Sequence, residues 1–177
     1  MATLSCPSSD LNFLSPNGFI LSIERLPKVT FFCQQVNLPS ISLAGLETPT
    51  PLSVIKIPSE RLEFSDLQLQ FAIDGQMNNW VEVYNWMKGL GFPETSTQYT
   101  TENMLRGFSE SSELANNYSD ARLIVLGPNN TPVRTFSFVD CYPTQLGGVE
   151  FSSTNTDVPY ATASLTLEYS YFKLDLT

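Results

Sequence analysis

The segment from residue 61 to residue 93 constrains the fold most, because its hydrophobic periodicity changes within one short stretch. Its first part alternates between apolar and polar side chains, with the polar Gln68 and Gln70 between the apolar Leu67, Leu69, Phe71 and Ile73. A period of two predicts a β-strand with one face on a core and the other face in water. Asp74-Gly75 then breaks this strand.

The second part of the same segment predicts a helix of about three turns. Its apolar face is expected to consist of Trp80, Val83, Tyr84 and Met87. We expect Asn78 or Asn79 to cap its start. Gly89 or Gly91 is expected to end it, before Pro93. No other part of the chain predicts a convincing helix.

The remaining chain predicts strands, turns and loops. A first hairpin is expected from residues 19–24 and 29–36, joined by a turn at Pro27-Lys28, and a second from residues 121–126 and 132–141. Residues 142–148 predict a turn and residues 149–152 a short strand. One long, alternating final strand is expected to start at Ala161.

Three segments are expected to lie outside regular structure. Residues 1–18 are rich in Ser and Pro and predict an N-terminal arm before a single domain, residues 19–177. Residues 94–120 predict a polar loop insert. Residues 37–59 contain repeated prolines between apolar pieces, which disfavours a central strand and predicts a long loop. This loop either packs on its own domain or reaches a neighbouring subunit as an arm.

The charge balance excludes one class of function. The chain has 18 acidic and nine basic residues and a net charge of −9. Nucleic-acid binding by counterion release needs clustered Lys and Arg, so it is not expected here. An acidic surface either serves solubility or repels a polyanion that passes along it. No apolar run has the length of a membrane span, and we expect neither membrane insertion nor a secretory signal.

The sequence offers little catalytic chemistry. It contains no histidine, which removes the commonest general base. Its three cysteines are far apart, without a CxxC pair, so we expect no metal site and interpret Cys33 and Cys141 as buried thiols. Asp66 with Asp74, or Glu60 with Glu63, would form a glycosidase-type pair only at a separation of about 5–10 Å. Solvated strand ends explain them better, and we expect no enzyme, catalytic residue or cofactor.

Three segments together resemble the tail tube protein family of contractile-tailed bacteriophages. The first runs from Phe31-Phe32-Cys33-Gln34 to Leu38-Pro39. The second is Leu62-Glu63-Phe64-Ser65-Asp66, followed by the alternating strand and the helix that holds Trp86. The third is Asp140-Cys141-Tyr142-Pro143-Thr144-Gln145-Leu146-Gly147, similar to the family's Pro-Thr-x-x-Gly turn, before the final strand. The resemblance covers most of residues 19–174; the N-terminal arm and the 94–120 insert depart from it.

This resemblance implies a mainly β fold, a β-sandwich or small barrel of antiparallel strands with one flanking α-helix. Strands of several copies would join into an inter-subunit barrel in a hexameric ring. Stacked rings would form the tail tube, with the tail sheath, the baseplate hub and the tape measure protein as partners. Double-stranded DNA would pass through the lumen without sequence-specific binding. The protein would be located in the virion tail after assembly in the host cytoplasm.

Two sets of residues are predicted to serve this function. The lumen-facing set, expected to be polar, is Gln68, Gln70, Thr162, Ser164, Thr166 and Glu168. The inter-ring contact set, expected to be apolar, is Leu43, Leu46, Leu52, Val54, Ile55 and Ile57. Three alternatives remain open: a tail tube initiator at the baseplate, a Type VI secretion tube, and a monomeric β-sandwich binding module with an exposed aromatic cluster.

Overall fold

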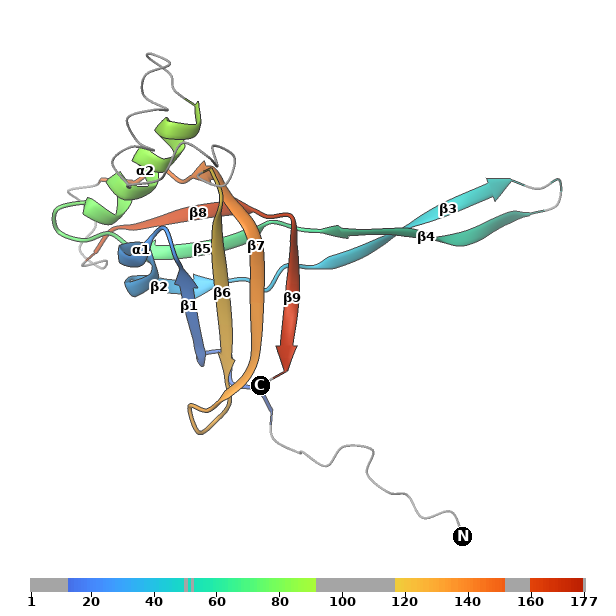
Figure 1. Ribbon diagram of the computed structural model, residues 1–177, viewed down its shortest axis with the longest axis horizontal. Coiled ribbons are helices and arrows are strands. Elements are labelled where there is room, and N and C mark those ends of the chain that lie inside the picture. Colours follow the sequence, from blue (N-terminus) through green and yellow to red (C-terminus); the bar gives the residue numbers. More distant parts are fainter. Residues whose placement is uncertain (1–12, 50, 52, 92–116, 152–159, 177) are drawn as a thin grey trace, which may run out of the picture.

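The computed structural model describes residues 13–49, 51, 53–91, 117–151 and 160–176. In chain order, the elements in Figure 1 are β1 (Phe19–Ile23), α1 (Pro27–Phe31), β2 (Cys33–Val36), β3 (Ile41–Pro49), β4 (Val54–Phe64), β5 (Leu67–Ala72), α2 (Asn78–Gly91), β6 (Ser119–Leu126), β7 (Pro132–Leu146), β8 (Thr162–Glu168) and β9 (Tyr171–Leu176). The fold is mainly β with one main helix, as the sequence predicts.

Two layers of antiparallel strands share the long strand β7. One layer has the order β1-β6-β7-β9, and the other has the order β2-β5-β8-β7. Figure 1 shows β5 and β8 running across the direction of β6, β7 and β9. The arrangement resembles an orthogonal β-sandwich, in which bent strands pass from one layer to the other.

The corner between the layers lies at Asp140. This residue has a φ of 58°, in the left-handed region, and its N–H donates to Oδ1 of Asp120 at 3.3 Å. In the bend between β8 and β9, the N–H of Ser170 donates to the carbonyl of Val139 at 3.0 Å. The prediction of one long final strand is therefore wrong: the chain bends between β8 and β9, because each half pairs with a different part of β7.

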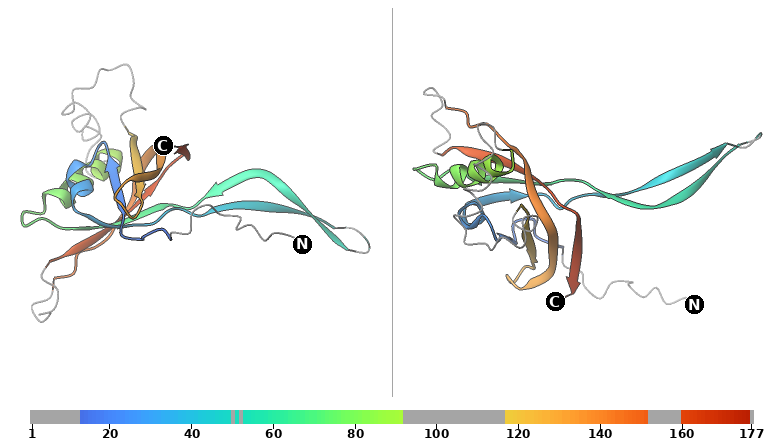
Figure 2. Two further views of the ribbon diagram at one scale, coloured as in Figure 1. Left: turned by 90° about the horizontal axis from the view of Figure 1, so that it is seen from below. Right: turned by 45° about the horizontal axis from the view of Figure 1, so that its top comes forward.

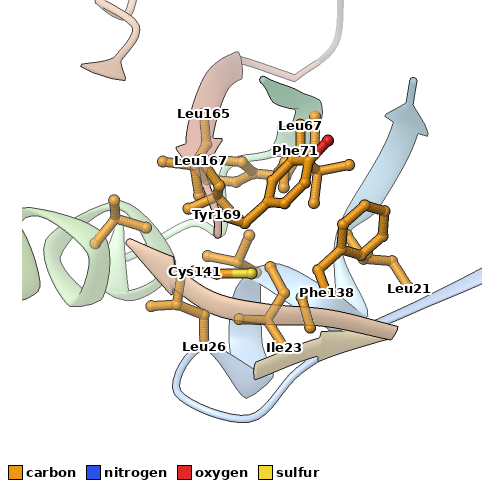
Figure 3. Packing of buried hydrophobic residues seen from close by; sticks show 14 of the residues in the cluster. Leu21, Ile23, Leu26, Leu67, Phe71, Phe138, Cys141, Leu165, Leu167 and Tyr169 are labelled. Atoms are coloured by element: carbon orange, nitrogen blue, oxygen red, sulfur yellow. The ribbon is translucent and has the colours of Figure 1, made fainter. Parts of the chain in front are cut away.

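The hydrophobic core fills the space between the layers. Figure 3 shows side chains from β1, β5, β7 and β8 meeting there. The predicted alternation in β5 is confirmed, because Leu67, Leu69 and Phe71 are buried while Gln68 is exposed. Fully buried side chains of this kind contribute about 1.5–3 kcal/mol each to stability.

The predicted helix is confirmed as α2, but its buried face is rotated. Val83 and Trp86 are buried together with Asn79, whereas Tyr84 is 43% exposed. The helix start is held by two side chains. The carboxylate of Asp74 accepts the N–H of Asn78 at 2.7 Å, and Oδ1 of Asn79 accepts the N–H of Trp80 at 2.9 Å. The helix ends at Gly91; Pro93 lies outside the described residues.

The first predicted hairpin is wrong. β1 pairs with β6 and β2 pairs with β5, and residues 27–31 form the short helix α1 instead of a turn. Pro27 suits the first position of a helix, and Leu26 and Val29 become fully buried at helical spacing. The second predicted hairpin, β6 with β7, is confirmed. The turn predicted at residues 142–148 is wrong for residues 142–146, which continue β7, and residues 149–151 form no strand.

Residues 41–49 and 54–64 form a long antiparallel hairpin, so the prediction of a loop over residues 37–59 is wrong. Both strands of a two-stranded ribbon are edge strands, which tolerate proline. Pro49 ends β3, and Pro58 lies opposite Gly45 beside an irregularity in the register. Most of the predicted 94–120 insert and residues 1–12 of the predicted arm lie outside the described residues.

A glycine closes the end of β7 against β8. The N–H of Gly147 donates to the carbonyl of Ser164 at 2.7 Å, and a Cβ on Gly147 would lie 3.2 Å from the backbone N and O of Ser164. We expect Gly147→Ala to lower the free energy of unfolding by about 1–3 kcal/mol, as overpacking does. Gly148→Ala is the matched control, because its Cβ would meet nothing within 4 Å. Equal stabilities of the two variants in urea unfolding would contradict this reading.

Burial of Cys141 predicts a loss of stability at alkaline pH. Desolvation, with a smaller contribution from Asp120, raises the pKa of its thiol from 9.0 to about 12. Above pH 9 the thiol therefore ionises in the unfolded chain but not in the folded one. Stability is lost as pH rises from 9 towards 12, with a slope of at most about 1.4 kcal/mol per pH unit.

Urea unfolding between pH 8 and 11 tests this expectation. The unfolding free energy should fall more steeply with rising pH in the wild type than in Cys141→Ala, because the other groups with raised pKa values are present in both chains. Parallel curves would show that Cys141 does not carry this dependence.

Candidate functional site

The β3–β4 hairpin projects from the body of the protein. Figures 1 and 2 show it extending well beyond both layers, in the direction that continues β5. β4 has 11 residues, which at roughly 3.3 Å per residue gives a reach of about 36 Å. The large apolar side chains of the two strands of the hairpin are about half exposed: Ile41, Leu43, Val54, Ile55, Ile57 and Leu62. An isolated two-stranded hairpin is only marginally stable in water, so these side chains require a partner.

The two sides of the hairpin differ in chemistry. Cross-strand partners project to the same side. Near the tip, Ile55 pairs with Thr48, and Ile57 pairs with the backbone position of Leu46. Glu47 and Lys56 form the next pair and lie on the opposite side, joined by an exposed ion pair of 3.5 Å. One side of the tip therefore carries Ile55 and Ile57 without a charge, and the other side carries the ion pair together with Val54.

The root of the hairpin is fixed to the body. The N–H of Ser40 donates to Oγ of Ser65 at 2.8 Å, and the N–H of Ser65 donates to the carbonyl of Ser40 at 3.0 Å. The hydroxyl of Tyr169 donates to the carbonyl of Ser65 at 2.8 Å. The ring of Phe64 packs edge to face on Phe172, with 5.3 Å between centroids. These contacts hold the direction of the hairpin relative to the two layers.

Most of the predicted inter-ring residues lie on this hairpin. Leu43, Val54, Ile55 and Ile57 are exposed there, although Val54 projects to the side opposite Ile55 and Ile57. Leu46 lies in β3, and Leu52 is outside the described residues. Sequence reasoning missed Ile41 and Leu62. Their alternation with Leu43 and Phe64 at a spacing of two was the available signal, and the surrounding prolines obscured it.

The predicted lumen-facing residues lie together on one face of β5 and β8. Gln68 pairs with Thr166, and Gln70 pairs with Ser164. Nε2 of Gln70 also donates to Oγ1 of Thr162 at 3.0 Å. The intervening residues of both strands are buried in the core, so this polar face is the reverse of the apolar one. On β2, Gln35 lies opposite Gln70 and extends the same polar surface.

Glu168 brings a carboxylate to this polar face. The hydroxyl of Tyr142 on β7 donates to Oε2 of Glu168 at 2.6 Å. This hydrogen bond is the main reason that the pKa of Tyr142 is raised to about 12. The face therefore presents amides, hydroxyls and one carboxylate, and none of the named positions is basic. Such a surface offers no attraction to a polyanion.

The carboxylates of the two possible glycosidase-type pairs do not face each other in the structure. Asp66 precedes β5 and Asp74 follows it, so the six residues of β5 separate them by roughly 20 Å. Glu60 and Glu63 lie three residues apart on β4 and project to opposite sides.

In the described ranges, no group of three or more His, Cys, Asp or Glu side chains is placed to hold a metal ion. No helix in those ranges has the length and apolar character of a membrane span.

Comparisons with known proteins confirm the resemblance. The family model described as T4-like virus tail tube protein gp19 matches residues 47–173. The tail tube terminator protein of Enterobacteria phage T4 is 25% identical over 171 residues, which is 93% of this chain and 90% of that protein.

Two solved structures show the same fold. The tube-terminating cap of the anti-feeding prophage aligns over 100% of both chains, with a TM-score of 0.65 at 13% identity. The sheath/tube terminator of the extracellular contractile injection system PVC aligns over 94% of this chain and 99% of that one, with a TM-score of 0.61 at 16% identity. Because the family match covers most of its length, the chain belongs to the T4-like virus tail tube protein family and is a structural protein related to the tubes of contractile tails.

Proposed function

We propose that this chain forms a hexameric ring in the tube of a contractile phage tail, with the polar face of β5 and β8 lining the channel. The observation that carries the proposal is a layer, β2-β5-β8-β7, that is polar on one face and apolar on the other. Its end strands are β2 and residues 142–146 of β7, and in the described chain each pairs on one side only. Open edges are positioned to pair with further strands.

Ring closure follows from these two edges. When the β2 edge of one copy pairs with the β7 edge of the next, the layers of successive copies continue as one sheet. Closure of that sheet removes the remaining edges and leaves the polar faces inside. The core and α2 then lie outside the barrel wall. The acidic and uncharged lining suits the passage of double-stranded DNA without adhesion during genome ejection.

The hairpin serves the contact between rings in this proposal. It continues the direction of β5 (Figure 1), so it extends past the rim of a ring whose strands run along the channel. An adjoining ring would cover its apolar side chains. The outer surface of such a ring is available to the sheath, in keeping with the sheath/tube terminator to which the fold is similar.

Two positions in the tube are possible for the ring. One is the body of the tube, built from stacked rings of this chain. The other is the ring that ends the tube, and the name of the T4 relative favours it, since that terminator aligns over nearly the whole chain. Electron microscopy of the purified chain distinguishes them: a tube subunit assembles into long tubes, whereas a terminal ring gives single rings or short stacks.

The role of the hairpin is tested by paired substitutions at its tip. We expect Ile55→Asp with Ile57→Asp to abolish contacts between rings while single rings remain, because two charges enter an apolar contact. Both side chains are half exposed, so the fold should be retained. The measurement is the mass of the assembly by light scattering, with negative-stain images. If rings of the double variant stack like those of the wild type, the hairpin does not form the contact between rings.

The channel assignment is tested by reversing the charge of Glu168. In a ring, Glu168→Lys places a basic side chain from every copy in the channel, and we expect rings that retain short double-stranded DNA at low salt and release it as salt rises. Glu24→Lys changes the net charge equally but follows β1, on the other layer, and should bind much less. Equal DNA retention by the two variants would contradict a channel lined by β5 and β8.

A further inference from the structure

A groove lined by both apolar and uncharged polar side chains lies between β1 and the α1–β2 segment. Its walls include Phe19 and Ile20 from β1 and Thr30, Phe31, Cys33 and Gln34 from the other side, around a volume of about 510 Å³. Phe31 is 81% exposed, although its ring packs edge to face on Phe32 with 5.0 Å between centroids. Ile20 beside it is half exposed. A large aromatic ring this exposed next to a second apolar side chain marks a contact surface.

We propose that this groove receives the apolar side of the hairpin tip, Ile55 and Ile57, from a second copy of the chain in an adjoining ring. The inference rests on the proposed function and names the acceptor for the hairpin. Each copy then carries both halves of one contact, a projecting hairpin and a groove.

Neither the groove nor the side of the tip that carries Ile55 and Ile57 contains a charged residue. The residues that line the groove include no acidic or basic side chain, although the chain carries 27 charged residues among 177. The side of the tip that carries Ile55 and Ile57 is likewise uncharged at Thr48, whereas Glu47 and Lys56 project away from it. With the apolar side inserted, the ion pair stays in water and no charge is buried.

The backbone and the overall shape also favour this pairing. β1 is an end strand of its layer. The N–H of Ile23 on its outer edge donates to Oγ1 of Thr30 at 3.1 Å, so the part of this edge before Ile23 is the part without a strand partner in the described chain. The two strands of the hairpin pair only with each other in the described chain, so a strand of the tip can lie along β1 with its own free edge. The hairpin projects away from the body that contains β1 and α1, as Figures 1 and 2 show, so its tip reaches another copy.

A hairpin-to-groove contact is head to tail, because it joins different surfaces of the two copies. Such heterologous contacts extend an assembly until a ring closes or an end is reached. The alternative is a contact between two hairpins, which would be symmetric and would not involve the groove. The two arrangements differ in what a groove substitution does.

The test uses three variants of the full chain. Phe31→Asp impairs the groove, and Ile55→Asp with Ile57→Asp impairs the hairpin. Phe151→Asp is the matched control, because Phe151 is also a phenylalanine, is 78% exposed and lies outside both surfaces. Circular dichroism checks that each variant is folded, and light scattering over a range of concentrations gives the mass of each assembly, alone and in equimolar mixtures.

We expect wild-type and Phe151→Asp rings to associate at high concentration and the groove and hairpin variants each to stay as single rings. An equimolar mixture of these two variants should double the mass and stop there. The intact hairpins of a Phe31→Asp ring can then bind the intact grooves of a ring of the hairpin variant. The impaired grooves of the first ring and the impaired hairpins of the second ring cannot bind a third ring. Association at least tenfold weaker in Phe31→Asp than in Phe151→Asp is the minimum that supports the proposal.

Three results would overturn it. If Phe31→Asp rings associate like the wild type, the hairpin binds elsewhere, while the proposed function stands. If the mixture fails to double in mass, the two surfaces are not partners. If wild-type rings form but never associate, the acceptor is not a second copy. A wild-type chain that forms no rings under any condition would contradict the proposed function itself.

Discussion

The corner at Asp140 and Ser170 is the constraint on which the rest of the structure depends. The N–H of Ser170 is held by the carbonyl of Val139, and Asp140 adopts a left-handed conformation beside it. These two positions allow β7 to serve both layers and force β8 and β9 apart. Without this bend, the apolar faces of the two layers would not enclose a common core, and the polar face of β5 and β8 would have no fixed relation to the hairpin.

The same corner explains why the apolar side chains of the hairpin remain uncovered. The core is complete between the layers, and its interior closes around Phe71, Phe138 and Trp86. The hairpin leaves the body at Ser65, where Tyr169 from the corner holds its root. Its tip therefore points away from the core that the described residues form. Burial of half-exposed isoleucine side chains by another copy yields on the order of 1 kcal/mol each, and many copies in one ring multiply this gain against the cost of association.

Sequence patterns predicted the elements whose stability is local. The alternation in β5, the helical spacing in α2 and the turn residues between β6 and β7 all specify their elements without reference to distant parts of the chain. The six polar positions on β5 and β8 were predicted for the same reason, since a period of two assigns residues to faces. The helix face was predicted less well, because Tyr84 and Trp86 are both aromatic and only packing decides which is buried.

The sequence by itself determined which faces are polar, where the main helix lies and which family the chain resembles. Only the tertiary structure decided the pairing partners, the bend that divides the final strand, and the conversion of a proline-rich segment into a projecting hairpin. Strand pairing depends on hydrogen bonds between residues far apart in the chain, as between β1 and β6. Local periodicity contains no information about those partners, which is why the groove beside Phe31 became visible only in the folded chain.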